Sequence, residues 1–212
     1  MTQLIDTSYR SDTFSAATDE QLLVRYRDNG DVNAFETLVH RYEKPLHRYL
    51  LRFLHSAALA DEVTQASFLR LHQKRKLFDD QRRVKPWLYN IATHLAIDAL
   101  RAEGRQHAAS LDAMQSVGDD DVGTLLNLLQ STSPSPIEEL EIGERAKWIR
   151  EAVNKLPSNL RVVVLLVYFQ GLTFHEAAET LHWPLGTVKS RVHQALLALH
   201  GTWRQGPTHG SE

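Results

Sequence analysis

The stretch Gly171-Leu172-Thr173-Phe174-His175-Glu176-Ala177-Ala178, followed by Pro184-Leu185-Gly186-Thr187-Val188-Lys189-Ser190-Arg191, decides how the C-terminal part of this chain folds. Thr173 followed three residues later by Glu176 is the pattern of a capping box, which begins a helix. Gly171 favours the end of whatever precedes that helix. After the turn at residues 182–186, apolar residues return with helical spacing at Val188, Val192, Ala195, Leu196 and Leu199. The stretch therefore predicts a helix-turn-helix.

The second helix of this motif is polar on the side that the apolar spacing leaves outside. We predict that its polar residues face outwards and contact DNA; they are Thr187, Lys189, Ser190, Arg191, His193 and Gln194. Lysine and arginine neutralise phosphates, whereas arginine, histidine, glutamine and serine can also reach base edges. A second helix with such residues near its N-terminal end is the element that enters a major groove. The alternative is an amphipathic helical hairpin that binds no DNA.

The charges are unevenly placed, although the net charge of the 212-residue chain is only -2. Residues 1–106 hold 16 Lys or Arg against 14 Asp or Glu, residues 107–144 hold none against 8, and residues 145–212 hold 8 against 4. An acidic segment between two mildly basic halves is typical of a linker between binding domains. The chain has no cysteine, which excludes disulfides and thiolate chemistry. The sequence shows no stretch of transmembrane length and no signal peptide, so we expect a soluble, cytoplasmic protein.

The first half of the chain reads as four helices. Thr18-Asp19-Glu20-Gln21 is a second capping box and begins a helix that ends at Asn29-Gly30. A longer helix begins near Asp31, and Pro45 inside it predicts a kink or a break. The third helix is expected from Ala60 to residues 76–78, and the fourth from Pro86 to Arg101, after a loop at residues 79–85. No strand pattern occurs, so the predicted fold class is all-α.

Several of these motifs together resemble a known family. Leu156-Pro157, the run at residues 161–169 and Gly186-Thr187-Val188-Lys189-Ser190-Arg191 resemble region 4 of a bacterial extracytoplasmic-function (ECF) sigma factor of the sigma-70 family. Three groups of residues in the first half resemble region 2 of the same family. They are Ala34-Phe35 with Arg41-Tyr42; Asp61-Glu62 with Gln65 and Phe68; and Trp87-Leu88 with Ile91-Ala92, Asp98 and Arg101. The chain departs from the family at His94, where the family usually has Asn, and at Gln194, a position that is often basic.

The resemblance implies two small helical domains, region 2 at 18–106 and region 4 at 145–203. A flexible acidic linker at 107–144 would join them, and residues 1–17 and 204–212 would be tails. It also implies a protein that binds core RNA polymerase, recognises minus-35 and minus-10 promoter elements and promotes DNA melting, without being an enzyme and without a cofactor. An anti-sigma factor is an expected further partner, whereas membrane insertion and a small-molecule substrate are not expected. The apolar patch Leu125-Leu126-Asn127-Leu128-Leu129 in the linker has no assigned role.

The resemblance also implies roles for residues of the first domain. Those placed near the minus-10 element are Arg82, Arg83, Lys85, Trp87, Asn90, His94, Arg101 and Arg105, with the loop at 79–85 beside a base flipped out of the duplex. Those placed on core polymerase are Asp61, Glu62, Gln65, Phe68 and Leu69. Alternatives stay open: Trp87 can pack in the core, the loop cations can be simply solvated, and Asp61 and Glu62 can be acidic residues favoured near a helix N-terminus.

Two other classes of protein were weighed. The first is a metalloenzyme or metal sensor, suggested by 11 histidines. The pairs His40 with His47 and His193 with His200 are each two helical turns apart, and no zinc-binding motif is present, so no metal site is predicted. The second is a transcription regulator that is not a sigma factor, whose N-terminal sensor domain controls the helix-turn-helix. The segment from Trp87 to Arg101 weighs against it, because a sensor has no need of a melting helix.

Overall fold

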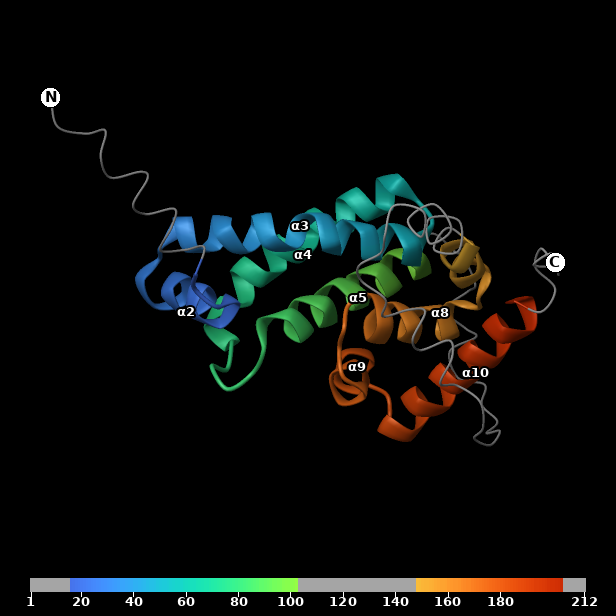
Figure 1. Cartoon of the computed structure of the whole chain (residues 1–212). Coiled ribbons are helices and arrows are strands. Elements are labelled where there is room, and N and C mark those ends of the chain that lie inside the picture. The colour runs from blue at the N-terminus through green and yellow to red at the C-terminus, as the bar shows by residue number, and fades with distance from the viewer. Residues whose placement is uncertain (1–15, 103–147, 204–212) are drawn as a thin grey trace, which may run out of the picture. The chain divides into compact units, whose positions relative to one another are not determined.

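The computed structural model describes residues 16–102 and 148–203, the last three of these by their backbone only. Within these two ranges the regular secondary structure is helical and no β-strand occurs, which confirms the predicted all-α fold class. The chain divides into two units at the Ala99–Leu100 bond, and each unit is described by itself (Figure 1). Several predicted features lie outside the described residues: the linker, Arg105, the patch at residues 125–129 and most of both tails.

Helix α2 (Asp19–Asn29) begins and ends where its sequence predicts. The Thr18 side chain accepts a hydrogen bond from the Gln21 backbone, and the Gln21 side chain accepts one from the Thr18 backbone, so the capping box is complete. Gly30 ends the helix in the left-handed region with φ 67°, which only glycine adopts without a steric cost. The short helix buries Leu22, Leu23 and Tyr26.

Helix α3 (Val32–Leu54) runs unbroken through Pro45, so of the kink or break expected at this residue the break does not occur. Asp31 caps its N-terminus, and His55 ends it with φ 58°. Proline removes one hydrogen bond inside a helix, at a substantial cost. Here apolar residues are buried on both sides of it, including Leu38, Tyr42, Leu46 and Leu50, and this continuous packing supports the helix across the proline.

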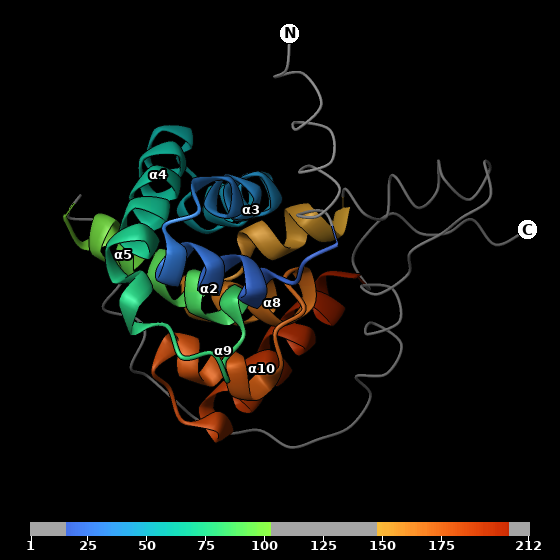
Figure 2. The ribbon, with the colours of Figure 1, turned by 90° about the vertical axis from the view of Figure 1, so that its left-hand side faces the viewer.

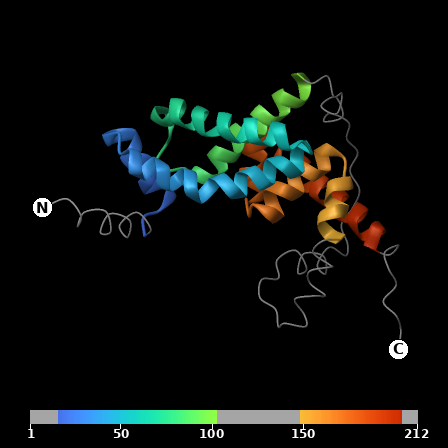
Figure 3. The ribbon, with the colours of Figure 1, turned by 90° about the horizontal axis from the view of Figure 1, so that it is seen from above.

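Helix α4 (Ala57–Lys74) packs antiparallel to α3 after a two-residue turn, as the view from above shows (Figure 3). It begins three residues earlier than predicted, because the Ser56 side chain accepts a hydrogen bond from Leu59 N and caps it there. A single 3-10 turn, η1 (Arg75–Leu77), follows it. The loop that comes next starts at the buried Phe78.

Helix α5 (Val84–Ala102) begins two residues before Pro86, the predicted start. Pro86 remains in its first turn, where the missing backbone N–H is no loss. The helix joins the core through Tyr89, whose ring lies 5.2 Å from that of Tyr49 on α3. The Tyr49 hydroxyl and the Thr93 hydroxyl are 2.7 Å apart, which satisfies both polar groups in the buried interface.

The second unit is built around a buried, unusually apolar segment. Residues 148–155 are helical, and α8 (Ser158–Val164) continues into one π-helical turn, η3 (Leu165–Phe169). Arg161, 8% exposed, donates from Nη1 to the carbonyls of Asn154 and Leu156, at 2.8 and 3.2 Å. It thereby satisfies carbonyls at the end of the preceding helix, and its burial lowers the pKa of its guanidinium.

Helices α9 (Phe174–Leu181) and α10 (Leu185–Trp203) form the predicted helix-turn-helix (Figure 2). The Thr173–Glu176 capping box is complete, and Gly171 has a positive φ of 66°, as the sequence indicates. His182 ends α9 in the left-handed region with φ 54°. Helix α10 begins at Leu185, inside the segment that the sequence reading assigned to the turn, and packs on α8 and α9.

Candidate DNA and polymerase interfaces

The first half of α10 has one buried and one exposed side. The apolar residues at helical spacing along α10 are at most 4% exposed, whereas Leu185 and Leu197 are 38% and 45% exposed; the buried ones are Val188, Val192, Ala195, Leu196 and Leu199. Lys189 is exposed, and the side chains of Thr187, Ser190, His193 and Gln194 are partly exposed. The packing on α8 and α9 thus holds a polar, cationic surface at the start of the second helix, which is the part of a helix-turn-helix that meets base edges.

Arg191 does not belong to this exposed surface, so its predicted outward orientation is wrong. Its side chain is 4% exposed, and its guanidinium carbon lies 3.9 Å from the centre of the Trp183 ring. Trp183 stands in the turn between the two helices, where its backbone N–H donates to Ala178 O at 3.0 Å. A desolvated guanidinium over an indole face is a favourable cation–π contact. Arg191 therefore joins the turn to α10 in the free protein.

The loop between η1 and α5 presents three polar side chains around a tight turn. Asp79 accepts from Gln81 N through its side chain at 3.0 Å and from Arg82 N through its backbone at 2.9 Å. Gln81, Arg82 and Arg83 are exposed, and the Arg82 guanidinium lies 3.9 Å from the Asp79 carboxylate. The two arginines that the sequence singled out are thus on the surface of a folded turn.

Helix α5 carries the remaining residues that were predicted to meet the minus-10 element. Trp87 is half-buried, and its ring lies 5.3 Å from that of the buried Phe78, so one part of the indole packs and another part stays accessible. Asn90 and His94 are also half-buried. His94 Nδ1 donates to the Asn90 carbonyl at 2.8 Å, which turns its ring back along the helix. Arg101 is exposed near the end of α5.

The residues predicted to meet the polymerase lie along α4. Asp61, Glu62, Gln65 and Leu69 are exposed, with Leu69 at 58%, and Phe68 is partly buried. The opposite side of the helix is buried at Ala60, Val63, Thr64, Ser67 and Leu71. The Asp61 carboxylate is 2.8 Å from His47 Nε2 on α3. The exposed side is therefore acidic at its start, which suits a basic partner. Further along it carries the apolar Leu69 next to the exposed Arg70.

Sequence reasoning missed three residues that organise these surfaces. Arg27 and Glu20 on α2 contact the loop between η1 and α5, and Trp183 holds Arg191. The contacts of Arg27 and Glu20 join residues 51 to 64 positions apart, and no local pattern announces them. For Arg191 a signal did exist, because it stands three residues after Val188 and four before Ala195, on the buried side of α10.

Two searches of the described residues bear on other classes of protein. No group of three or more His, Asp or Glu side chains in residues 16–102 and 148–203 is placed to hold a metal ion. In the same part of the chain no helix is both long and apolar enough to cross a membrane.

The chain matches two family models. Residues 38–106 match sigma-70 region 2, and residues 146–199 match sigma-70 region 4. It is 31% identical over 170 residues to the ECF RNA polymerase sigma factor SigW of Bacillus subtilis. This match covers 80% of this chain and 89% of that relative. It is 30% identical over 182 residues to the ECF RNA polymerase sigma-E factor of Escherichia coli K12, covering 85% of this chain and 92% of that relative.

Two solved structures share the fold. The structure of CnrH in complex with the cytosolic domain of CnrY aligns with a TM-score of 0.60 at 21% identity, over 89% of this chain and 99% of the matched chain. The sigma factor RpoE of Bartonella quintana, solved with the anti-sigma factor NepR, aligns with a TM-score of 0.57 at 18% identity, over 82% and 98%. At these identities the likeness concerns the fold alone.

These matches define a class of protein, the bacterial RNA polymerase sigma factors of the sigma-70 type. Within that class the chain belongs to the ECF sigma factors. It is a sigma factor of transcription initiation, and proteins of this family are DNA-binding regulators rather than enzymes. A regulator with an N-terminal sensor domain is not favoured, because the N-terminal unit contains a sigma region 2.

Proposed function

We propose that this protein directs core RNA polymerase to promoters through three separate surfaces on its two units. Region 2 at 18–106 binds the polymerase and opens the minus-10 element, and region 4 at 145–203 reads the minus-35 element. One observation carries this proposal. The first half of α10 exposes polar side chains on a helix-turn-helix whose apolar side is buried, and the same chain has a sigma region 2.

The upstream element is read by the first half of α10. Lys189 is exposed and neutralises a phosphate, while Ser190, His193 and Gln194 are partly exposed and reach base edges or sugar oxygens. Gln194 can make a bidentate contact with adenine, which a lysine or arginine at this place would not make. Arg191 is left out of the contact set, because it packs on Trp183.

The downstream element is opened by α5 and the loop before it. Arg82 and Arg83 are exposed and attract the backbone of the separated strand, and the accessible part of Trp87 offers a face on which an unpaired base stacks. Lys85, Asn90, His94 and Arg101 continue this surface along α5. Arg105, which lies outside the described residues, is a further candidate contact. Stacking contributes only after the bases are unpaired, so this surface favours the open complex over the duplex.

The polymerase is bound by the exposed side of α4. Asp61, Glu62 and Gln65 provide charge and hydrogen bonds, and Leu69 with part of Phe68 provides apolar area. A second partner is an anti-sigma factor, as in the structure of RpoE with NepR. Because the polymerase and the promoter are cytoplasmic in bacteria, we place the action of this sigma factor there.

Selection of DNA by the reconstituted holoenzyme tests this division of labour. Core polymerase with the full-length protein is allowed to bind a random duplex library, and the retained DNA is sequenced. The wild type should enrich two separate elements at a fixed spacing on the duplex. Gln194→Ala, which removes the proposed base contact, should weaken enrichment of the upstream element only. Arg150→Ala, which removes an exposed arginine elsewhere in the same unit, is the matched control. Unchanged enrichment with Gln194→Ala would contradict the role of α10.

A further inference from the structure

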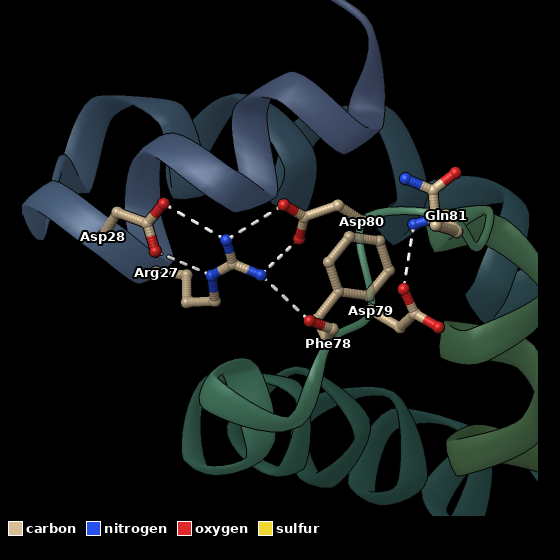
Figure 4. A network of polar contacts seen from close by, with 6 residues as sticks. All are labelled: Arg27, Asp28, Phe78, Asp79, Asp80 and Gln81. Atoms are coloured by element: carbon tan, nitrogen blue, oxygen red, sulfur yellow. Dashed lines mark hydrogen bonds and ion pairs between the residues drawn. The ribbon is translucent and has the colours of Figure 1, made fainter.

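The loop between η1 and α5 is fastened to α2 at its first residues. Arg27 Nη1 donates to the carbonyl of Phe78 at 2.9 Å, and its guanidinium also binds the Asp80 carboxylate, with Nη2 at 3.2 Å from Oδ2 (Figure 4). The neighbouring Asp28 carboxylate accepts a hydrogen bond from Arg27 Nε at 2.7 Å and so holds the guanidinium from the other side. Hydrogen bonds to Asp28 and Asp80 raise the pKa of Arg27, whose guanidinium is a cation in proteins in any case.

The same helix fastens the end of the loop. The Glu20 carboxylate accepts a hydrogen bond at 3.1 Å from the backbone of Val84, the first residue of α5. This bond satisfies a free N–H at the helix start and adds a negative charge where the helix dipole favours one. Phe78 is 5% exposed and Val84 is fully buried, so both ends of the segment are also anchored by packing.

Between these two anchors the loop has one defined shape. The Asp79 turn fixes the backbone of Gln81 and Arg82, and Figure 4 shows the Gln81 backbone N–H directed at the Asp79 carboxylate. Gln81, Arg82 and Arg83 are exposed on the segment that results. Neither Arg27 nor Glu20 is part of that exposed group, since each is partly buried against the loop.

We propose that Arg27 and Glu20 of α2 are positioning residues for promoter recognition, which hold the loop at residues 78–84 in the conformation that meets the separated minus-10 strand. The proposal rests on the function proposed above for this loop. It assigns to α2 a role that is neither DNA contact nor polymerase contact: the helix sets the shape of a recognition loop that comes 50 residues or more after it in the chain.

The physical effect is on the population of the binding conformation. A loop that loses an anchor samples more backbone conformations, and the apparent affinity of its ligand falls by the fraction of time spent in the competent one. The Asp80 and Asp28 side chains are 51% and 50% exposed, so solvent screens each ion pair and the effect should be moderate. We expect Arg27→Ala to weaken enrichment of the minus-10 element about fivefold, a size typical of losing partly exposed charged contacts.

The test uses the full-length protein in the reconstituted holoenzyme, with the random duplex library as the probe. Arg27→Ala and Glu20→Ala should each weaken the preference for bases of the downstream element, while enrichment of the upstream element and retention of core polymerase stay at the wild-type level. Arg25→Ala, which removes an exposed arginine from the same helix, is the matched control. If Arg27→Ala folds poorly, Asp80→Asn removes the same ion pair from the exposed side of the contact.

Charge exchange separates positioning from a general loss of stability. Asp80→Arg alone places two cations together and should reduce the downstream preference. Arg27→Asp combined with Asp80→Arg should recover only the part that the ion pair contributes, because a carboxylate at position 27 cannot donate to the Phe78 carbonyl. Amide hydrogen exchange at Gln81 and Arg82 should speed up in Arg27→Ala and slow again in the exchanged pair. Wild-type exchange rates and base preferences in Arg27→Ala, or in Asp80→Asn where that variant replaces it, would overturn the proposal.

A loop variant shows which of the two proposals fails. Arg82→Ala changes an exposed residue of the loop itself and leaves both anchors in place. If Arg82→Ala and Gln81→Ala alter the downstream preference whereas Arg27→Ala does not, the loop reads the promoter and the positioning role of α2 is wrong. If none of these variants alters it, the function proposed for the loop is itself wrong, and the positioning role is refuted with it.

Discussion

Replacing Arg191 by alanine should destabilise the C-terminal unit without removing a DNA contact. The side chain is 4% exposed, and its guanidinium lies 3.9 Å from the centre of the Trp183 ring. A desolvated cation–π contact contributes about 2 kcal/mol, and the aliphatic stem of a buried arginine adds packing that alanine loses. We therefore expect Arg191→Ala to lower the free energy of unfolding by about 2 to 3 kcal/mol. Arg191→Lys keeps the charge but not the flat face, so it should lose about half as much.

Urea unfolding of the full-length protein, followed by far-ultraviolet circular dichroism and by tryptophan fluorescence, measures this loss. Hydrogen exchange along α10 assigns the transition to the C-terminal unit. Lys189→Ala is the matched control: this exposed neighbour should change stability by less than about 0.5 kcal/mol while weakening duplex binding. An Arg191→Ala protein with wild-type stability and severely weakened duplex binding would refute the reasoning, because Arg191 would then be an outward-facing contact after all.

Three further predictions concern the N-terminal unit. The double variant Asp61→Lys with Glu62→Lys should weaken holoenzyme assembly in a pull-down with core polymerase, because both carboxylates are exposed on the side of α4 that we assign to the polymerase. Trp87→Ala should leave binding to upstream duplex unchanged and reduce permanganate reactivity of the minus-10 element, and a template with a pre-melted bubble should restore initiation. Burial raises the pKa values of Tyr49 and Tyr89, so the contribution of these two phenols to the free energy of unfolding should be constant below the phenol pKa of an unfolded chain, about 10, and should fall as the pH rises above it.

Each of these predictions has a control and a contrary outcome. Glu36→Lys with Glu43→Lys adds the same charge on exposed positions of α3 and should leave assembly intact; equal losses in both double variants would indicate a general charge effect. Trp87→Phe should retain stacking, and a Trp87→Ala protein that simply unfolds would make Trp87 a core residue. Stability that stays level above pH 10 in urea titrations would mean that the buried phenols ionise as freely as in the unfolded chain.

The sequence was sufficient for features that depend on neighbours along the chain. Both capping boxes, at Thr18 and Thr173, and both glycine ends, at Gly30 and Gly171, are present because each needs only residues within one helical turn. The helix-turn-helix and the helices of the N-terminal unit could be predicted for the same reason, since helical periodicity is a local signal.

The sequence was insufficient where a distant partner decides. Helix α5 begins at Val84 because Glu20, 64 residues earlier, accepts its first N–H, and α3 crosses Pro45 because its buried side is packed on both sides of the proline. The predicted orientation of Arg191 was wrong for another reason. Its charge suggested an outward orientation, whereas its spacing from Val188 and Ala195 places it on the buried side. The ring of Trp183 makes that burial favourable, and nothing local in the sequence announces the contact.

Sequencing of transcripts made in vitro tests the central claim most directly. Core polymerase is incubated with fragmented genomic DNA from the source organism, with and without the full-length protein, and the RNA 5′ ends are mapped. The account predicts a set of start sites that depends on the protein and shares a minus-35 and a minus-10 element. It also predicts that Gln194→Ala relaxes the first element and that Trp87→Ala reduces initiation unless the second is already melted. Start sites that are the same with and without the protein would contradict the account.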